Sequence, residues 1–227
     1  MPMIPIHLVN GIHFCPEKEI RMMLLHGNES RTYDKSAIVS FRKTNEEFGG
    51  LSNMAPGFLI TVNGHTFLTS EALYQCCRFP KYPDIQKQIM SQKSPMTAKD
   101  ISKAHIYLSR EDWNDERIRI MRWCVYAKLI CNWHTFGKLL DSTGNKDIVE
   151  DSFKDDFWGA IWNGSQFVGT NALGRLLMQA RDMYRKNISH THLLLPALDS
   201  PDFYLLGKSI ESISVDTSEQ PQEITFW

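Results

Sequence analysis

The chain of 227 residues lacks the features of membrane and secreted proteins. It contains no apolar run near the roughly 18 residues that a transmembrane helix needs, so we expect no membrane partner. Residues 1–5 lack the basic and long apolar regions of a signal peptide. Neither sign of charge dominates, since 25 basic residues balance 26 acidic ones. A nucleic-acid ligand would therefore have to be held by a local patch of charge.

Cysteine and histidine do not occur at the spacings of disulfide frameworks or metal sites. The five cysteines are odd in number and include no CxxC pair, which predicts free thiols in a cytoplasmic protein. The eight histidines include no HExxH motif. We therefore expect neither a metal nor another cofactor.

No repeat and no low-complexity linker divides the chain, whose length allows one large domain or two small ones. We predict an α+β fold in a single domain, with helices around a small, mainly antiparallel sheet. Residues 48–186 are expected to form the central domain. Residues 1–47 form an N-terminal extension with short strands at residues 4–9 and 37–42, and residues 187–227 form a C-terminal extension.

Residues 58–67 predict a β-hairpin that leads into a helix. Two runs of alternating apolar residues flank Asn63-Gly64, the dipeptide typical of a two-residue hairpin turn. Thr69 or Ser70 can then cap the N-terminus of a helix through a side-chain oxygen. The local order is thus strand, tight turn, strand, helix.

The first turn of this helix carries Glu71, which would point into the mouth between the end of the sheet and the start of the helix. One face of the helix collects polar side chains at positions i, i+3, i+4 and i+7: Glu71, Tyr74, Gln75 and Arg78. This face is too polar for ordinary core. The plain alternative is that Glu71 only complements the helix dipole, a contribution of about 0.3–1 kcal/mol.

Four further helices are predicted from apolar periodicity and end signals. They cover residues 84–91, residues 96–104 after Ser94-Pro95, residues 115–133 and residues 171–185. The helix at 115–133 has two apolar stripes, which is typical of a helix buried between layers.

Two tryptophans outside these helices are candidates for a ligand site. Trp113 precedes the long helix, and Trp158 lies in an acidic loop before Gly159. Exposed loop tryptophans suit a planar ligand, because stacking on a base contributes roughly 1–3 kcal/mol; the alternative is a place in the core. The same loop carries Asp155 and Asp156, which without further support are a solvated loop with capping duties.

A glycine-containing run at residues 169–178 opens the last helix. It is not a GxGxxG loop, but free backbone N–H groups at Thr170 or Asn171 could bind a phosphate. The alternative is an N-cap, with Gly174 allowing close packing of the helix.

In their order along the chain, these motifs resemble the NADAR (YbiA-like) family over residues 48–186. The resemblance is carried by Leu51-Ser52-Asn53, Glu71–Gln75, Ser94-Pro95-Met96, Trp113, Asp155–Gly159 and Gly169–Met178. NADAR proteins act on N-glycosidic bonds of ribose-phosphate compounds, and the resemblance implies this activity here.

The implied chemistry assigns roles to the candidate residues. Cleavage of a C1′–N bond passes through an oxocarbenium-like centre, which a carboxylate stabilises; Glu71 fits this role, and Asp155 matches the acidic position of the family. Trp113 and Trp158 match tryptophans that line the family's active site, and Arg78 offers a cation for phosphate. The remaining substrate-binding candidates are Ser52, Asn53, Tyr74, Gly159 and Asn171.

An alternative route would use a lysine amine that attacks the opened sugar and forms a Schiff base, which demands a buried lysine with a lowered pKa. Lys99 is the candidate. The chain departs here from the bacterial YbiA-like pattern, which has lysine where this chain has Arg78 before Phe79. The identity of a catalytic amine therefore stays open.

The family divides between two activities. One branch hydrolyses reactive intermediates of the riboflavin pathway, and the other removes ADP-ribose from guanine in DNA as an antitoxin to DarT-like DNA ADP-ribosyltransferases. Residues 71–80, the N-terminal extension and residues 203–209 are similar to the antitoxin branch. We therefore expect ADP-ribosylated DNA as the ligand and a DarT-like toxin as the functional partner. The alternatives are the riboflavin activity and a non-catalytic ADP-ribose reader.

Overall fold

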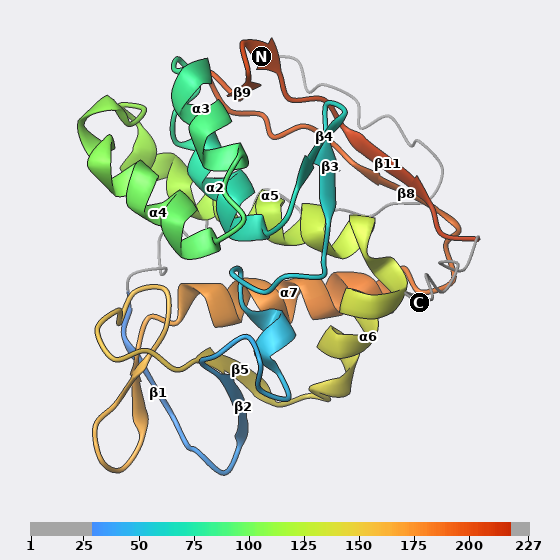
Figure 1. Ribbon diagram of the computed structural model, residues 1–227. Helices are drawn as coiled ribbons and strands as arrows, with labels where there is room; N and C mark the ends of the chain where they lie inside the picture. The colour runs from blue at the N-terminus through green and yellow to red at the C-terminus, as the bar shows by residue number, and fades with distance from the viewer. Residues whose placement is uncertain (1–28, 219–227) are drawn as a thin grey trace, which may run out of the picture.

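The computed structural model describes residues 29–218 (Figure 1). Two long helices, α5 (Trp113–Cys131) and α7 (Ala172–Lys186), cross the middle of the molecule. On one side of them lie α2 (Ser70–Cys77), α3 (Pro83–Met90), α4 (Pro95–Ala104), the hairpin β3 (Ile60–Val62)–β4 (His65–Phe67), and the pair β8 (His192–Leu195)–β11 (Ile213–Asp216). On the other lie η1 (Gly49–Leu51), α6 (Trp133–Ser142), β1 (Arg31–Tyr33), β2 (Ile38–Phe41), β5 (Asp147–Glu150), β6 (Ile161–Trp162) and β7 (Phe167–Gly169). The chain is completed by η2 (Ile106–Leu108), β9 (Tyr204–Leu205) and β10 (Lys208–Ser209).

The fold is α+β, as predicted, but its strands are spread over several small sheets rather than one. β1, β7 and β6 form an antiparallel sheet, and β3–β4, β8–β11 and β9–β10 are antiparallel pairs. The pair β2–β5 is parallel. The strands have two to four residues each, and the helices separate them, so each pair covers a different part of the helical centre.

The predicted hairpin and the helix after it are confirmed. Asn63 and Gly64 both have positive φ, at 50° and 77°, which is the backbone that a type I′ turn requires. Thr69 caps α2, because its Oγ1 accepts the N–H of Ala72 at 3.2 Å. A side chain in the first turn of α2 is therefore held against the end of the hairpin.

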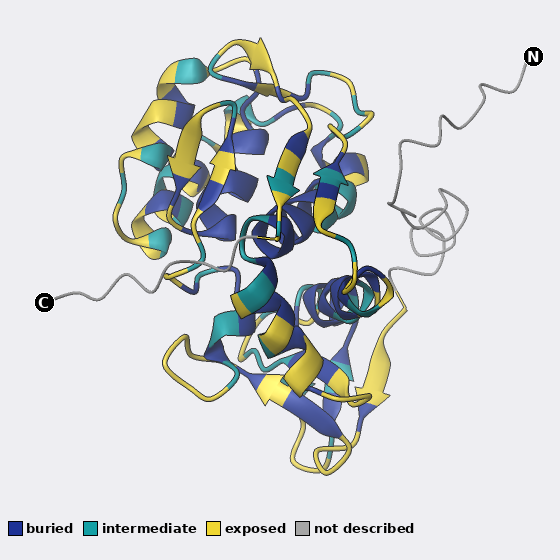
Figure 2. Cartoon of the chain, turned by 90° about the vertical axis from the view of Figure 1, so that its right-hand side faces the viewer, coloured by how far each residue is buried: buried dark blue, intermediate teal, exposed yellow. Residues whose placement is uncertain are grey.

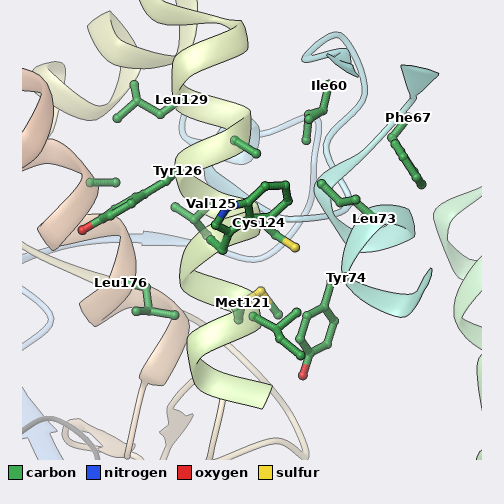
Figure 3. Close-up of a cluster of buried hydrophobic side chains, with 14 of the residues drawn as sticks. Ile60, Phe67, Leu73, Tyr74, Met121, Cys124, Val125, Tyr126, Leu129 and Leu176 are labelled. Atoms are coloured by element: carbon green, nitrogen blue, oxygen red, sulfur yellow. The ribbon is translucent and has the colours of Figure 1, made fainter. Parts of the chain in front are cut away.

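Helix α5 is buried between layers, as its two apolar stripes indicated. Figure 3 shows Leu73 of α2 on one side of it and Leu176 of α7 on the other, with Met121 and Val125 of α5 between them. In Figure 2 the buried residues face the interior on both sides, and the exposed residues lie mainly on the outer surfaces. Burial of each such side chain contributes about 1.5–3 kcal/mol.

The expected end of α5 is wrong. The helix stops at Cys131 rather than at residue 133, and α6 then runs from Trp133, which the sequence analysis did not predict. Asn132 leaves the helical region, at φ −132° and ψ 44°, and its Nδ2 donates to the carbonyl oxygens of Leu59 and Lys128, each at 2.9 Å. The local bond to Lys128 and the tertiary bond to Leu59 favour the break without a glycine or proline.

The segments that flank the central region belong to the same domain. The strand expected at residues 37–42 is β2, which pairs with β5; the strand expected at residues 4–9 lies outside the described residues. After α7, Trp123 of α5 donates its Nε1 hydrogen to Pro196 at 2.9 Å and packs edge-on against Phe203. The C-terminal strands therefore share the core of α5.

Cys76, Cys77, Cys124 and Cys131 are free, as expected, and Cys15 lies outside the described part. None of the helices in residues 29–218 has the length and apolar character that crossing a membrane requires.

Candidate functional site

A cavity of about 400 Å³ opens where α2, α4, the start of α5 and the loop after β5 meet. It brings together most of the predicted site residues: Ser52, Asn53, Glu71, Tyr74, Arg78, Lys99, Trp113, Asp155 and Trp158. Gly159 and Asn171 lie outside its lining. A larger groove of about 880 Å³, between β3, the start of α6 and β11, contains none of these candidates.

The carboxylate of Glu71 is held at the base of this cavity with 6% of the residue exposed. Its Oε1 accepts a hydrogen bond from Gln75 Nε2 at 2.8 Å, one turn further along α2. The polar face that helical spacing predicts for α2 faces this cavity, since Tyr74, Gln75 and Arg78 also line it. Burial and the neighbouring charge of Glu71 raise the pKa of Tyr74, so its hydroxyl stays neutral.

Asn53 ties the start of α2 to the rest of the site. Its carbonyl oxygen accepts the backbone N–H of Glu71 at 3.0 Å, and its Oδ1 accepts the hydroxyl of Ser70 at 3.0 Å. Its Nδ2 lies 2.8 Å from the sulfur of Met121 on α5. Asn53 therefore positions the backbone of Glu71 and also lines the cavity.

A buried lysine of α5 holds the backbone of residues 50–52, which lead into Asn53. Lys128 is only 1% exposed, and its Nζ donates to the carbonyl oxygens of Gly50 at 2.7 Å and Ser52 at 3.0 Å. It lies over the rings of Phe58 and Phe136, and within residues 29–218 it has no carboxylate partner. Burial lowers the pKa of Lys128 to about 7. Lys128 is outside the cavity lining, so it holds the wall rather than reaching a ligand.

The loop after β5 supplies a second acidic side chain. Asp155 Oδ1 accepts the N–H groups of Phe157 at 3.0 Å and Trp158 at 2.8 Å, and its own N–H donates to Ser152 Oγ at 3.0 Å. Asp155 thus orders a turn of its own loop and caps no helix, and it also lies on the cavity wall. Asp156 is exposed and does not line the cavity.

Glu150 is a cavity carboxylate that the sequence analysis missed. It ends β5 and lies on the cavity wall. Burial raises the pKa of Glu150 to about 7, and the charges of Asp155 and Glu71 add to the rise, whereas Lys99 opposes it. The sequence does carry a signal for this residue, a glutamate directly after the apolar pair Ile148-Val149 at the end of a strand. Its position beside the other acids depends on the pairing of β5 with β2.

The last helix offers no phosphate site at its N-terminus, and that expectation is wrong. The N–H groups of residues 170–173 donate to carbonyl oxygens of residues 156–159, at distances from 2.6 to 3.0 Å. Asn171 instead donates through Nδ2 to Ile148 and accepts the N–H of Glu150 at 3.2 Å, which positions the end of β5. A Cβ on Gly174 would collide with the carbonyl oxygen of Ile148, so the close packing proposed as the alternative is present.

Aromatic rings form one wall of the cavity. The ring of Tyr74 lies 5.0 Å from Trp113 and 5.8 Å from Trp158, and Trp158 is 5.0 Å from Phe157. The expectation that Trp113 lies outside the long helix as an exposed loop residue is wrong: it is the first residue of α5 and only 9% exposed. Trp158 is half-buried, and it is the better candidate for contact with a planar ligand.

We expect Trp158→Ala to weaken binding of ADP-ribose by roughly 1–3 kcal/mol, because a stacking surface is lost. Isothermal titration calorimetry measures this affinity. Trp162→Ala is a matched control, since Trp162 lies on β6 outside the cavity. Unchanged affinity together with a loss of about 3–5 kcal/mol of stability would make Trp158 a core residue only.

Lys99 lies on the cavity wall from α4 and is half-buried. Its charge acts on Glu150, as the opposing influence on that pKa indicates. The amine route demands a buried lysine, and the buried lysine of this region is Lys128, which does not line the cavity. A catalytic role for Lys99 stays a prediction.

Comparison with known proteins identifies a domain family and several relatives. A sequence profile of the NADAR domain matches residues 40–185. The N-glycosidase YbiA of Escherichia coli strain K12 is 31% identical over 150 residues, which cover 65% of this chain and 89% of that protein. The NMR structure of E. coli YbiA superposes with a TM-score of 0.59 and 29% identity, covering 68% of this chain and 89% of that one.

Two riboflavin biosynthesis proteins are also similar. One, from Vibrio vulnificus strain YJ016, is 32% identical over 162 residues, which cover 71% of this chain; the other, a chloroplastic protein of Zea mays, is 36% identical over 157 residues, which cover 63%. The match spans only 42% and 25% of these two relatives. The profile, in contrast, covers more than half of the chain, with the cavity residues inside it, and the chain therefore belongs to the NADAR family.

Proposed function

We propose that this chain hydrolyses an N-glycosidic bond, and that the bond joins ADP-ribose to a guanine base of DNA. The class of reaction is that named for its relatives, the N-glycosidases YbiA. The observation that carries the proposal is the meeting of Glu71, Glu150 and Asp155 in one cavity with an aromatic wall. Cleavage of a glycosidic bond typically uses a pair of carboxyl groups beside the sugar.

The acids differ in their surroundings, which supports a division of labour. The side chain of Glu71 is held in place by the hydrogen bond that it accepts from Gln75, and its carboxylate can stabilise the positive charge that develops at C1′. Glu150, with its pKa raised to about 7, holds a proton in part of the population at neutral pH. Glu150 can therefore protonate the leaving guanine nitrogen as the C1′–N bond breaks, while water adds to C1′ and gives up a proton that restores the acid form of Glu150. Asp155 orders the loop that follows β5.

The assignment to DNA rests on resemblance. Residues 71–80 are similar to the branch that reverses DNA ADP-ribosylation, and a DarT-like transferase would then be the functional partner, in the cytoplasm. A second candidate, hydrolysis of riboflavin-pathway intermediates, is favoured by the names of the Vibrio and maize relatives. A non-catalytic reader of ADP-ribose is the third.

The purified protein is expected to release ADP-ribose from a DNA oligonucleotide with one modified guanine, in buffer containing EDTA. Chromatography with mass detection compares this rate with the rate on riboflavin-pathway intermediates at equal substrate concentration. Turnover of the riboflavin intermediates with none of the modified DNA would assign the chain to the other branch. Turnover of the modified DNA that is seen without EDTA and lost when EDTA is added would contradict the expectation of a metal-free reaction.

A further inference from the structure

Two arginines reach the cavity without the carboxylate partners that arginines usually have. Arg78, at the end of α2, donates its Nε hydrogen to Ser109 Oγ at 2.7 Å, and its guanidinium lies 4.9 Å from the centre of the Trp113 ring. Arg117, on the first turns of α5, lies over Phe157 at 3.9 Å. Neither forms an ion pair within residues 29–218.

Arg117 also has an unsatisfied donor. Its Nε is buried and makes no hydrogen bond within the described part of the chain. Leaving a buried donor without a partner is unfavourable, so the site favours a ligand with oxygen acceptors. The ring faces of Trp113 and Phe157 fix both guanidinium groups in place and leave hydrogen-bond donors free.

The cavity lining carries charges of both signs, with Glu71, Glu150 and Asp155 as acids and Arg78, Lys99 and Arg117 as cations. The charges of Asp155 and Glu71 raise the pKa of Glu150, and Lys99 opposes that rise. Arg78 and Arg117 lie on rings that line or adjoin the same aromatic wall, and beside burial the charge of Arg117 lowers the pKa of Arg78. Two like charges at a half-buried place repel, and an anion between them would offset the repulsion.

The ring of Tyr74 contacts both Trp113, over which Arg78 lies, and Trp158, whose backbone N–H donates to Asp155. Its pKa is raised by burial and by Glu71, whereas Arg117 and Arg78 act on it in the opposite direction. Tyr74 is therefore influenced by the acid Glu71 and by both arginines. A ligand that spans the cavity would have its anionic group at the arginines and its glycosidic carbon at the acids.

We propose that Arg78 and Arg117 form a clamp for a phosphate group carried by the sugar whose N-glycosidic bond is cleaved. The assignment of the sugar rests on the proposed function. Phosphate suits the pair, since a monoester carries about −1.5 to −2 charges and three acceptor oxygens, a diphosphate is likewise anionic and rich in acceptors, and guanidinium groups bind such oxygens through paired N–H donors. The phosphate can be the monoester of a ribose 5-phosphate or the diphosphate of ADP-ribose.

Titration calorimetry of ribose 5-phosphate, ADP-ribose and unphosphorylated ribose tests this clamp. Arg117→Gln is expected to weaken binding of a phosphorylated ligand by roughly 10- to 100-fold, the loss of a charged hydrogen-bonding group, and to leave ribose binding unchanged. The salt dependence of binding should fall as well. Arg119→Gln is the matched control, because Arg119 lies on the same helix but bonds Glu116 and Asp199.

The choice of ligand separates the two sources of phosphate. A loss confined to ribose 5-phosphate assigns the clamp to a monoester, and a loss for ADP-ribose assigns it to the diphosphate. Equal weakening of ribose and its phosphate, or no weakening in Arg117→Gln and Arg78→Gln alike, would overturn the clamp. If Arg117→Gln does not fold, Arg117→Lys replaces it, which keeps the charge and should recover only part of the affinity.

These measurements need no turnover, so the clamp and the proposed hydrolysis can fail separately. Arginine-dependent binding of a sugar phosphate by a protein that cleaves no N-glycosidic bond would keep the clamp and reject the hydrolase. Hydrolysis of ADP-ribosylated DNA with the same KM in wild type and Arg117→Gln would keep the hydrolase and reject the clamp.

Discussion

Glu71→Gln is expected to lower the rate of hydrolysis by about 10²–10⁴-fold while the protein stays folded and still binds ADP-ribose. Glutamine keeps the shape of the side chain and its contact with Gln75 but removes the negative charge that stabilises the oxocarbenium-like centre. Single-turnover kinetics measures the chemical step, and titration calorimetry measures binding.

Glu116→Gln is the matched control for this variant. Glu116 is also a buried carboxylate, but it lies outside the cavity and bonds Arg119. The control should hydrolyse substrate at the wild-type rate. Near-normal hydrolysis by Glu71→Gln would reject its catalytic role, and the absence of hydrolysis in wild type with intact binding would favour the ADP-ribose reader.

Glu150→Gln is expected to have the second large effect, a loss of roughly 10²–10⁴-fold below pH 7. The pKa of Glu150 is about 7, so its acid form is abundant below that pH and is lost above it. The wild-type kcat/KM should therefore fall as pH rises through about 7. The variant lacks the titrating group, and its profile should be flat over this range.

The free energy of unfolding gives an independent check on Glu150. The carboxyl group takes up its proton near 4.5 when the chain is unfolded and near 7 when it is folded. The folded state therefore gains stability from Glu150 at low pH, and this gain is lost as pH rises from about 4.5 to above 7. Chemical denaturation at several pH values should show this loss in wild type and not in Glu150→Gln. The same pH dependence in both proteins would contradict the assignment.

Features that depend on neighbouring residues could be predicted from the sequence. Asn63-Gly64 encodes its own turn, and Thr69 caps α2 through a contact three residues away. The polar face of α2 follows from helical spacing alone, which is why Glu71 and Arg78 were found. The break at Asn132 could not be read, because its bond to Leu59 joins residues far apart in the sequence.

The rest of the site depends on long-range contacts. Glu150 reaches the cavity because β5 pairs with β2 and because Asn171 holds its backbone. From the sequence, Arg117 is an ordinary solvated helix residue. Its place over the ring of Phe157 depends on a contact between α5 and a loop 40 residues later in the chain. The predicted phosphate contact at Thr170 failed for the same reason, since the N–H groups there are taken by a loop that only the fold brings near.

The most direct test of the proposed reaction is the product mixture formed from a DNA oligonucleotide with one ADP-ribosylated guanine. Mass spectrometry of a time course with wild-type protein is predicted to show free ADP-ribose and unmodified guanine in the DNA, appearing at equal rates. DNA that stays modified while the protein binds it would contradict hydrolysis of the bond between ADP-ribose and guanine. A strand that loses guanine together with ADP-ribose would contradict it as well.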